Sequence, residues 1–345
     1  MTQQIHYPWP EPPAPGQATE VAPGVLWMRL PLPMRLDHVN VYALDDADGW
    51  TIIDTGFDTG KSRAIWQMLL DGPLHSRPVR RVIATHHHPD HIGLAGWFME
   101  HGAQLWTTRT AWLTARMLVL DEQPAPTPQA VAFWRAAGMP PDLLAQRATE
   151  RPFNFADCVH PIPQGYTRLV EGQTIRLAGR DWRIATGDGH APEHATFWSQ
   201  DDDLVIGGDQ LLPGISPNLG VYATEPGADP VAEWLDSCDR FATLARPDHL
   251  VLPGHKLPFT GLPLRLTQMS ENHIGALDRV QALLAQAPNT AVGCFPALFK
   301  RPIGHGEMTL ALVEAVAHLN WLAVRDRIER AGSDDTGATL WRAVA

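Results

Sequence analysis

Six consecutive residues, His86 to His91, read His-His-His-Pro-Asp-His and form the densest group of chemically active side chains in the sequence. Side chains alternate along a strand, so His86 and His88 are expected to point the same way from a strand predicted for residues 79–85. Past the strand end the chain turns, which lets Asp90 and His91 approach from another direction. Imidazole and carboxylate bind zinc, iron and similar metals, so this loop offers ligands to two neighbouring ions.

Three later segments each place one more potential ligand directly after a predicted strand and beside glycine, which lets the backbone turn tightly. They are His190 in Gly-Asp-Gly-His, Asp209 in Gly-Gly-Asp and His255 in Pro-Gly-His. A histidine-rich surface loop would account for the first motif alone. It would not account for three further ligands in this order at strand ends, so the pattern indicates a metal centre.

Short apolar segments separated by turns predict the strands that position these ligands. The predicted strands span residues 25–30, 39–44, 50–54, 79–85, 167–170, 174–177, 182–186, 196–199, 204–206 and 250–252. Helices are predicted for residues 58–70, with Asp58 as a possible N-cap, for 92–101 and for 229–245. Two strand-rich halves joined by helices predict stacked sheets with helices outside them.

The pattern changes near residue 263, where apolar residues begin to recur at helical spacing. The predicted elements there are helices at 266–284, 291–300 and 307–323, then strands at 327–331 and 339–343. Three helices followed by a hairpin is the order of a winged helix-turn-helix. The predicted domains are therefore a proline-rich arm at 1–20, a catalytic domain at 21–262 and a winged-helix-like domain at 263–345.

Composition limits the partners and the compartment. The 345-residue chain has a formal net charge of −11, and clustered Lys and Arg are what phosphate binding requires, so nucleic acid and anionic membranes are not expected partners. No run of about 18 apolar residues occurs, so no membrane-spanning helix is expected. Three scattered cysteines, Cys158, Cys238 and Cys294, predict no disulfide framework and favour a reducing, cytoplasmic environment.

The motifs HxHxDH, GH, GGD and PGH together resemble those of the metallo-β-lactamase superfamily over residues 20–260. Asp54, Thr55 and Gly56, which follow a predicted strand, also match an early motif of that superfamily. The resemblance implies an α/β fold, the four-layer αβ/βα sandwich. The segment after residue 262 resembles the winged-helix appendage found on one branch of the superfamily.

The resemblance also implies a ligand set for two divalent metal ions, with zinc as the first choice and iron or manganese as alternatives. The first ion would take His86, His88 and His190, the second Asp90, His91 and His255, and Asp209 would bridge both. A bridging carboxylate resembles the glyoxalase II-like and lactonase-like members and differs from the true β-lactamases. Asp90 is also assigned a catalytic role in managing the proton of the nucleophile, and Asp54 is expected to orient the metal loop.

Two such ions can share a water and lower its pKa toward neutrality, which implies attack by a bridging hydroxide. The expected substrate is a small molecule with a carboxylic ester-type bond: a thioester, lactone or ester. Ala191 and Glu193 stand where thioester hydrolases commonly carry Ser or Thr and Gly, which argues against glyoxalase II activity itself. The alternatives are phosphodiester cleavage, including RNA, and iron-dependent sulfur dioxygenation.

Several neighbouring residues have an open role at this stage. His87 is expected to face outward or to lie beyond the ligands, and His194 either supports a ligand or packs in the interior. Asp58, His38 and Asn40 lie near strand ends that are expected to face the site, and Asn40 is expected to hold a turn through its side chain. Tyr222 could donate to an oxyanion, and the aromatic residues within 109–150 either pack on the main domain or form an apolar wall of the pocket.

A nucleic-acid-binding regulator is the competing non-enzymatic interpretation, and it predicts a basic recognition helix. Residues 307–323 instead carry Glu307 and Glu314 and no Lys or Arg. We therefore expect the C-terminal segment to serve packing or homodimer formation. Fluorescence anisotropy with labelled duplex DNA should show no saturable sub-micromolar binding at low salt, because phosphate neutralisation supplies most of such affinity. Salt-sensitive sub-micromolar binding would show this interpretation to be wrong.

Overall fold

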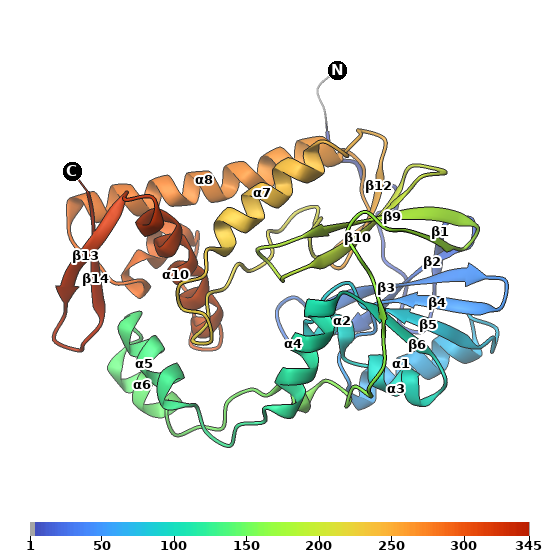
Figure 1. The fold of residues 1–345 in the computed structure, drawn as a ribbon, viewed down its shortest axis with the longest axis horizontal. Coiled ribbons are helices and arrows are strands. Elements are labelled where there is room, and N and C mark those ends of the chain that lie inside the picture. The colour runs from blue at the N-terminus through green and yellow to red at the C-terminus, as the bar shows by residue number, and fades with distance from the viewer. Residues whose placement is uncertain (1–3, 345) are drawn as a thin grey trace. The chain divides into compact units, whose positions relative to one another are not determined.

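The computed structural model describes residues 4–344, which divide into two compact units (Figure 1). Among the described residues, the first unit comprises residues 4–122, 154–217 and 242–266. The second unit comprises residues 123–153, 218–241 and 267–344. Each unit is made of three separate chain segments, unlike the continuous domains predicted at 21–262 and 263–345, whose bounds stay a prediction.

The first unit contains a seven-stranded sheet in which the strands follow one another in chain order from β1 to β7. Its strands are β1 (Thr19–Ala22), β2 (Val25–Pro31), β3 (His38–Asp46), β4 (Gly49–Ile53), β5 (Val79–Ile83), β6 (Gln104–Thr107) and β7 (Thr167–Arg168). The first four strands pair antiparallel and the last four pair parallel. Parallel neighbours need crossovers. These are α1 (Gly60–Asp71) between β4 and β5, and α2 (Pro89–Ile92) with α3 (Ala95–Glu100) between β5 and β6.

A second sheet of five strands has the order β12-β11-β10-β9-β8. Its strands are β8 (Thr174–Leu177), β9 (Arg180–Gly187), β10 (His194–Ser199), β11 (Leu204–Gly208) and β12 (Leu250–Pro253). β11 and β12 pair parallel, and the other neighbours pair antiparallel. The carboxyl ends of β11 and β12 therefore lie at the same edge of the sheet.

Alternating side chains of the first sheet enter two separate cores. In β3, Val41 packs with Trp66 of α1, whereas its neighbour Tyr42 packs with Trp182 and Phe197 of the second sheet. The first sheet is thus covered by helices on one face and by the second sheet on the other, and α1 and α3 lie along its outer side (Figure 1). This layered α/β arrangement confirms the predicted fold class.

Two helix predictions need correction. Helix α1 begins at Gly60, and Thr59 caps it by accepting a hydrogen bond from the Ser62 amide, so the predicted cap Asp58 is wrong. Thr59 has the extended backbone that a capping residue needs, and the Asp58 carboxylate instead accepts two hydrogen bonds from Arg63. The helix predicted at 92–101 is two short helices, α2 and α3, and α2 begins inside the histidine motif.

The second unit is mainly helical. Its elements include α5 (Pro128–Ala136), α6 (Pro141–Arg147), most of α7 (Pro230–Ala242) and of α8 (Leu262–Gln286), α9 (Phe295–Leu298), α10 (Met308–Val324), β13 (Ile328–Ser333) and β14 (Thr339–Ala343). The predicted order of three helices and an antiparallel hairpin is present, while its winged-helix character stays a prediction. Within residues 4–344, every helix is too short or too polar to cross a membrane.

Glu314 on α10 gives the second unit a testable pH dependence. Its carboxylate accepts a hydrogen bond of 2.9 Å from Asn218, and burial raises the pKa of Glu314 from 4.5 to about 7. The folded state therefore holds the Glu314 proton at a pH where the unfolded chain has lost it. As the pH rises from 4.5 to 7, this group alone lowers the free energy of unfolding, by roughly 2–3 kcal/mol.

The variant Glu314→Gln should therefore gain stability relative to the wild type as the pH rises through this window. Burial lowers the pKa of His273 to about 3 and of His318 to about 4, which gives the opposite slope, so the informative quantity is the difference between the two proteins. Thermal unfolding across the window measures it, with the exposed Glu329→Gln as the control. A pH-independent difference would contradict the assignment.

Candidate metal centre

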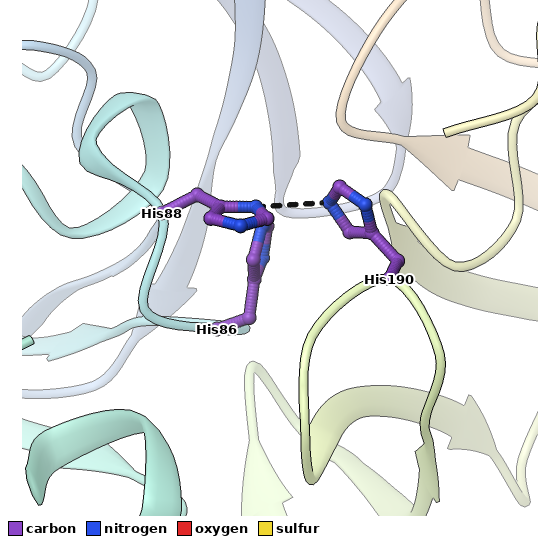
Figure 2. A group of neighbouring side chains, drawn as sticks. All are labelled: His86, His88 and His190. Atoms are coloured by element: carbon purple, nitrogen blue, oxygen red, sulfur yellow. Dashed lines mark hydrogen bonds between the residues drawn. The ribbon is translucent and has the colours of Figure 1, made fainter. Parts of the chain in front are cut away.

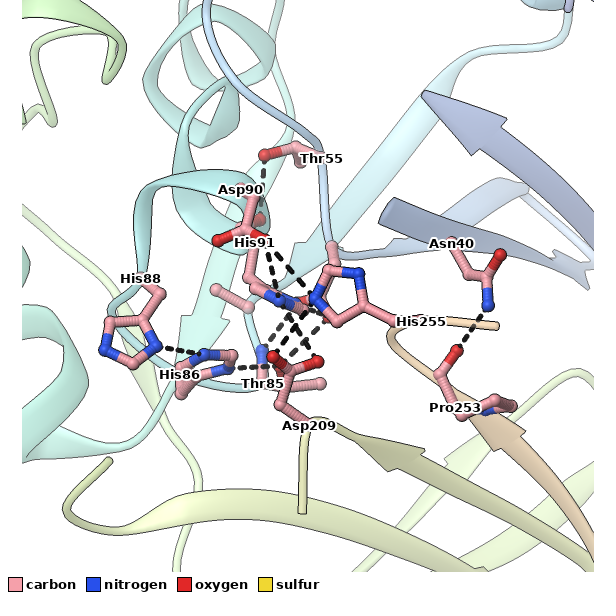
Figure 3. Close-up of polar contacts among 12 residues, drawn as sticks. Asn40, Thr55, Thr85, His86, His88, Asp90, His91, Asp209, Pro253 and His255 are labelled. Atoms are coloured by element: carbon pink, nitrogen blue, oxygen red, sulfur yellow. Dashed lines mark hydrogen bonds and ion pairs between the residues drawn. The ribbon is translucent and has the colours of Figure 1, made fainter. Parts of the chain in front are cut away.

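Every predicted ligand lies in the first residues after the carboxyl end of a strand. His86, His88, Asp90 and His91 follow β5, and the remaining three, His190, Asp209 and His255, follow β9, β11 and β12. Loops at such strand ends are the usual location of ligand sites in α/β folds. The structure brings all seven side chains together (Figures 2 and 3).

His86, His88 and His190 form the first group (Figure 2). The Nδ1 atom of His88 lies 2.9 Å from Nε2 of His86 and 3.0 Å from Nε2 of His190. Burial and the neighbouring imidazoles hold the pKa of His86 and His88 well below 6.5. These two rings are therefore neutral at physiological pH, which is the form that binds a metal.

Asp90, His91 and His255 form the second group (Figure 3). The Asp90 carboxylate lies 3.4 Å from Nε2 of His255 and 3.6 Å from Nε2 of His91. Burial lowers the pKa of His91 and His255, but the surrounding carboxylates, led by Asp209, outweigh it and raise both, that of His255 to about 10. This second group therefore has a strong preference for positive charge.

Asp209 lies between the two groups. One of its carboxylate oxygens is 3.3 Å from Nε2 of His91, and the other is 3.1 Å from Nε2 of His255 and 3.4 Å from Nε2 of His190. A single carboxylate thus faces ring nitrogens of both groups. This is the position that a bridging ligand requires.

Two buried atoms test whether a metal fits this site. Nε2 of His91 and Oδ1 of Asp209 face each other, and neither has a hydrogen-bond partner among the described residues. Leaving a buried polar atom unpaired costs about 1–3 kcal/mol, and more for a charged one. A cation held between them would satisfy both, and the histidine and carboxylate donors suit zinc, iron or manganese.

Asp54 orients His91, as the sequence predicted, and is not one of the grouped ligands. Its carboxylate accepts a hydrogen bond of 2.7 Å from Nδ1 of His91, which leaves Nε2 of that ring directed at Asp209. The same carboxylate accepts from the amide and the hydroxyl of Thr85, the residue before His86. One side chain therefore fixes both ends of the histidine motif.

The loop of His255 is held by strand β3. Nδ1 of His255 donates to the carbonyl of His38 at 2.7 Å, so its Nε2 is left for the site. The Pro253 carbonyl accepts from Tyr42 at 2.8 Å. It also accepts from Asn40 at 2.9 Å, as Figure 3 shows. The predicted turn-holding role of Asn40 is confirmed. His38, which was expected near the site, contacts this loop through its carbonyl and through its ring, which accepts from the Lys256 amide at 2.9 Å.

Two histidines next to the ligands are buried. His194 accepts a hydrogen bond from the Asp209 amide through Nε2 at 3.1 Å, and its ring stacks on His86, so it supports the ligands. His87 is only 9% exposed, and its ring lies nearly parallel to that of Phe155, with centroids 6.4 Å apart. The prediction that His87 faces outward is therefore wrong, and the alternative, that it lies beyond the ligands, fits its place outside the ligand groups. Phe155 is far from His87 in sequence, and nothing in the motif predicted that contact.

Close approach explains one glycine of the ligand motifs. A Cβ at Gly254, the residue before His255, would lie 2.2 Å from the Asp209 carboxylate and 2.8 Å from the ring of His91. Any larger residue would therefore displace two of the predicted ligands. The glycine beside His255 is required by space as well as by the turn.

Other candidate residues lie elsewhere. Asp58 pairs with Arg63 and His160 instead of facing the ligands. Trp112 stacks on Tyr166 with ring centroids 4.8 Å apart, which supports a packing role. Tyr222, Phe133 and Trp134 belong to the second unit, so their predicted roles at the pocket stay predictions.

Comparison with known proteins gives the same family along most of the chain. A family model described as the metallo-beta-lactamase superfamily matches residues 34–255, and one described as a metallo-beta-lactamase-like C-terminal domain matches residues 277–342. The chain is 25% identical over 319 residues to the probable metallo-hydrolase YqjP of Bacillus subtilis (strain 168), covering 88% of this chain and 93% of that protein.

Solved structures agree. A beta-lactamase domain protein from Burkholderia ambifaria superimposes with a TM-score of 0.90 at 36% identity, covering 99% of this chain and 98% of that one. The metallo-beta-lactamase family protein TTHA1429 from Thermus thermophilus gives a TM-score of 0.77 at 28% identity, covering 94% of this chain and 100% of that one. The similarity therefore extends through both compact units.

The different positions of Asp209 and Asp54 lead to different expected losses of metal. Asp209→Ala removes the carboxylate that faces both groups, so the purified variant should retain at most one ion. Asp54→Ala removes only the orienting bond to His91, which typically weakens metal binding by about 10–100-fold. Elemental analysis and chelator competition measure both. Asp58→Ala is the matched carboxylate control, and equal metal retention in all three variants would exclude a bridging Asp209.

Proposed function

Because this chain belongs to the metallo-β-lactamase superfamily, we propose that its seven clustered ligands hold two divalent metal ions and that it hydrolyses a carboxylic ester-type bond. Family and relatives make the chain a metal-dependent hydrolase. The metal number, the metal and the bond cleaved are the proposal, with zinc as the first choice and a thioester, lactone or ester as substrate.

The position of Asp209 is the observation that carries the two-metal proposal. Its two oxygens face His91 on one side and His190 and His255 on the other, at 3.1–3.4 Å. A single-metal site needs three or four ligands and would leave several of these buried donors unsatisfied. Seven converging donors, one of them a carboxylate that faces both groups, are better explained by two neighbouring ions.

The chain's own residues supply orientation and proton transfer. When bound, two divalent ions would supply an acidified water and Lewis acidity at the bond under attack. Burial raises the pKa of Asp90, but the neighbouring His91 and His255 have the larger, opposite effect, so the pKa lies below its usual value of 3.8. The carboxylate therefore stays ionised and can accept a proton from the nucleophile. Asp54 and the His38 carbonyl fix the ring tautomers of His91 and His255 while this proton moves.

The charge of the chain supports the choice among hydrolytic substrates. A net charge of −11 disfavours a long polyanion such as RNA, because such binding depends on neutralising many phosphates. Iron-dependent sulfur dioxygenation stays an alternative because the same donor types suit iron. Because of the net charge, we propose a small-molecule substrate.

The three cysteines are buried and form no disulfide, and on this basis we propose a cytoplasmic location.

Metal analysis followed by a substrate panel tests this function. The purified protein should hold close to two ions per chain and turn over thioesters, lactones or esters without consuming oxygen. Asp90→Asn should lower kcat by about 10²–10⁴-fold, as expected when a proton-transfer group is lost, while Asp58→Asn leaves kcat unchanged. One ion per chain, turnover of phosphodiesters alone or oxygen-dependent sulfur chemistry would each overturn the proposal.

A further inference from the structure

The loop that carries His190 contains a residue with an unusual backbone. Glu193 has a φ of 50°, in the left-handed region that favours glycine. Of the described residues that share this property, Asp54 and Lys256 also adjoin predicted ligands: Asp54 binds His91, and Lys256 follows His255. A strained backbone of this kind persists only where surrounding contacts hold it, and it is often found at functional sites.

The contacts that hold Glu193 reach out of its own loop. Its amide donates to the side chain of Asp188 at 2.8 Å, which closes the loop on itself. Its carboxylate accepts from the amide of Thr110 at 2.9 Å and also from the Thr110 hydroxyl, while Arg168 approaches the other oxygen at 3.8 Å. Thr110 lies in the first turn of α4 (Arg109–Leu120), where backbone amides have no partner within the helix and the helix dipole favours an anion.

The two neighbours of this contact both face the metal centre. His190 lies three residues before Glu193 and directs Nε2 at His88 and Asp209, and His194 follows Glu193 and binds the Asp209 amide. Gly189, with a φ of 94°, precedes His190 and leaves that side of the loop with little intrinsic stiffness. The Glu193–Thr110 contact thus joins the stretch between these two histidines to a helix that is distant in sequence.

We propose that Glu193 is a positioning residue: by fastening the His190 loop to the first turn of α4, it sets the place of His190 in the metal centre. The inference rests on the proposed metal-binding function and adds a role for a residue outside the ligand set. Glu193 adopts a left-handed backbone that is strained for any residue other than glycine. Its hydrogen bonds to Thr110 maintain this conformation. Loss of the carboxylate frees the loop without removing any ligand.

Three variants of the full-length protein separate this role from simple helix capping. Glu193→Gly tolerates the left-handed backbone, so it should fold, but it lacks the anchor. Glu193→Gln retains an oxygen that can accept from Thr110 but loses the charge. Thr108→Ala is the matched control, because Thr108 caps α4 within the helix itself, by accepting from the Ala111 amide.

We would measure the metal affinity, the visible spectrum of the cobalt-loaded protein and the amide exchange of the metal-free protein. Glu193→Gly should bind one of the two ions about 10-fold more weakly, as typical for loss of an orienting partner, and should alter the cobalt spectrum. Glu193→Gln should fall between it and the wild type. The Thr110 amide should exchange faster in metal-free Glu193→Gly. Thr108→Ala should lower the melting temperature but keep the affinity and the spectrum.

The outcomes distinguish this inference from the function on which it rests. A Glu193→Gly variant with wild-type affinity and spectrum would overturn the positioning role and leave Glu193 as a helix cap only. Equal loss of affinity in Thr108→Ala would also overturn it, because the integrity of α4 would then be the cause. A wild-type protein that binds no metal would overturn the proposed function itself, and this inference with it.

Discussion

Three carboxylates surround one fully buried imidazole, and this concentration of negative charge is the constraint on which the rest of the site depends. Asp54, Asp90 and Asp209 all lie within 3.6 Å of the ring nitrogens of His91. Buried carboxylates repel one another and are costly to desolvate unless a cation or a proton balances them. The two apolar cores on either face of the first sheet fix the strand ends that hold these groups together.

Local patterns made the fold and the clustering of the seven candidate ligands predictable. A nearly continuous run of apolar residues, such as that of β3, marks a strand buried on both faces, and glycine-flanked His and Asp residues at strand ends mark the candidate metal centre. The sequence could not decide between Asp58 and Thr59 as a cap, because both types cap helices well. It also could not show that His87 is buried or that Glu193 reaches Thr110, because those contacts join distant parts of the chain.

The division into units was beyond local patterns for a similar reason. Residues 123–153 and 218–241 belong with the C-terminal residues, although the chain returns to the first unit between and after them. Within the second unit, Asn218 donates to the carbonyl of Leu310 and to the side chain of Glu314, and the Val221 amide donates to the Val313 carbonyl. Such contacts depend on tertiary packing and leave no periodic trace in the sequence.

The ring nitrogen that His88 presents has a consequence for how this centre can change in evolution. His86 and His190 direct Nε2 inward, whereas His88 directs Nδ1. The number of bonds from Cα to Nδ1 equals the number from Cα to a carboxylate oxygen of aspartate. A single-base change in a histidine codon yields aspartate, so the reach at residue 88 can be kept while a neutral donor becomes an anionic oxygen. Oxygen donors favour harder ions such as manganese, which makes this position a direct route to a different metal preference.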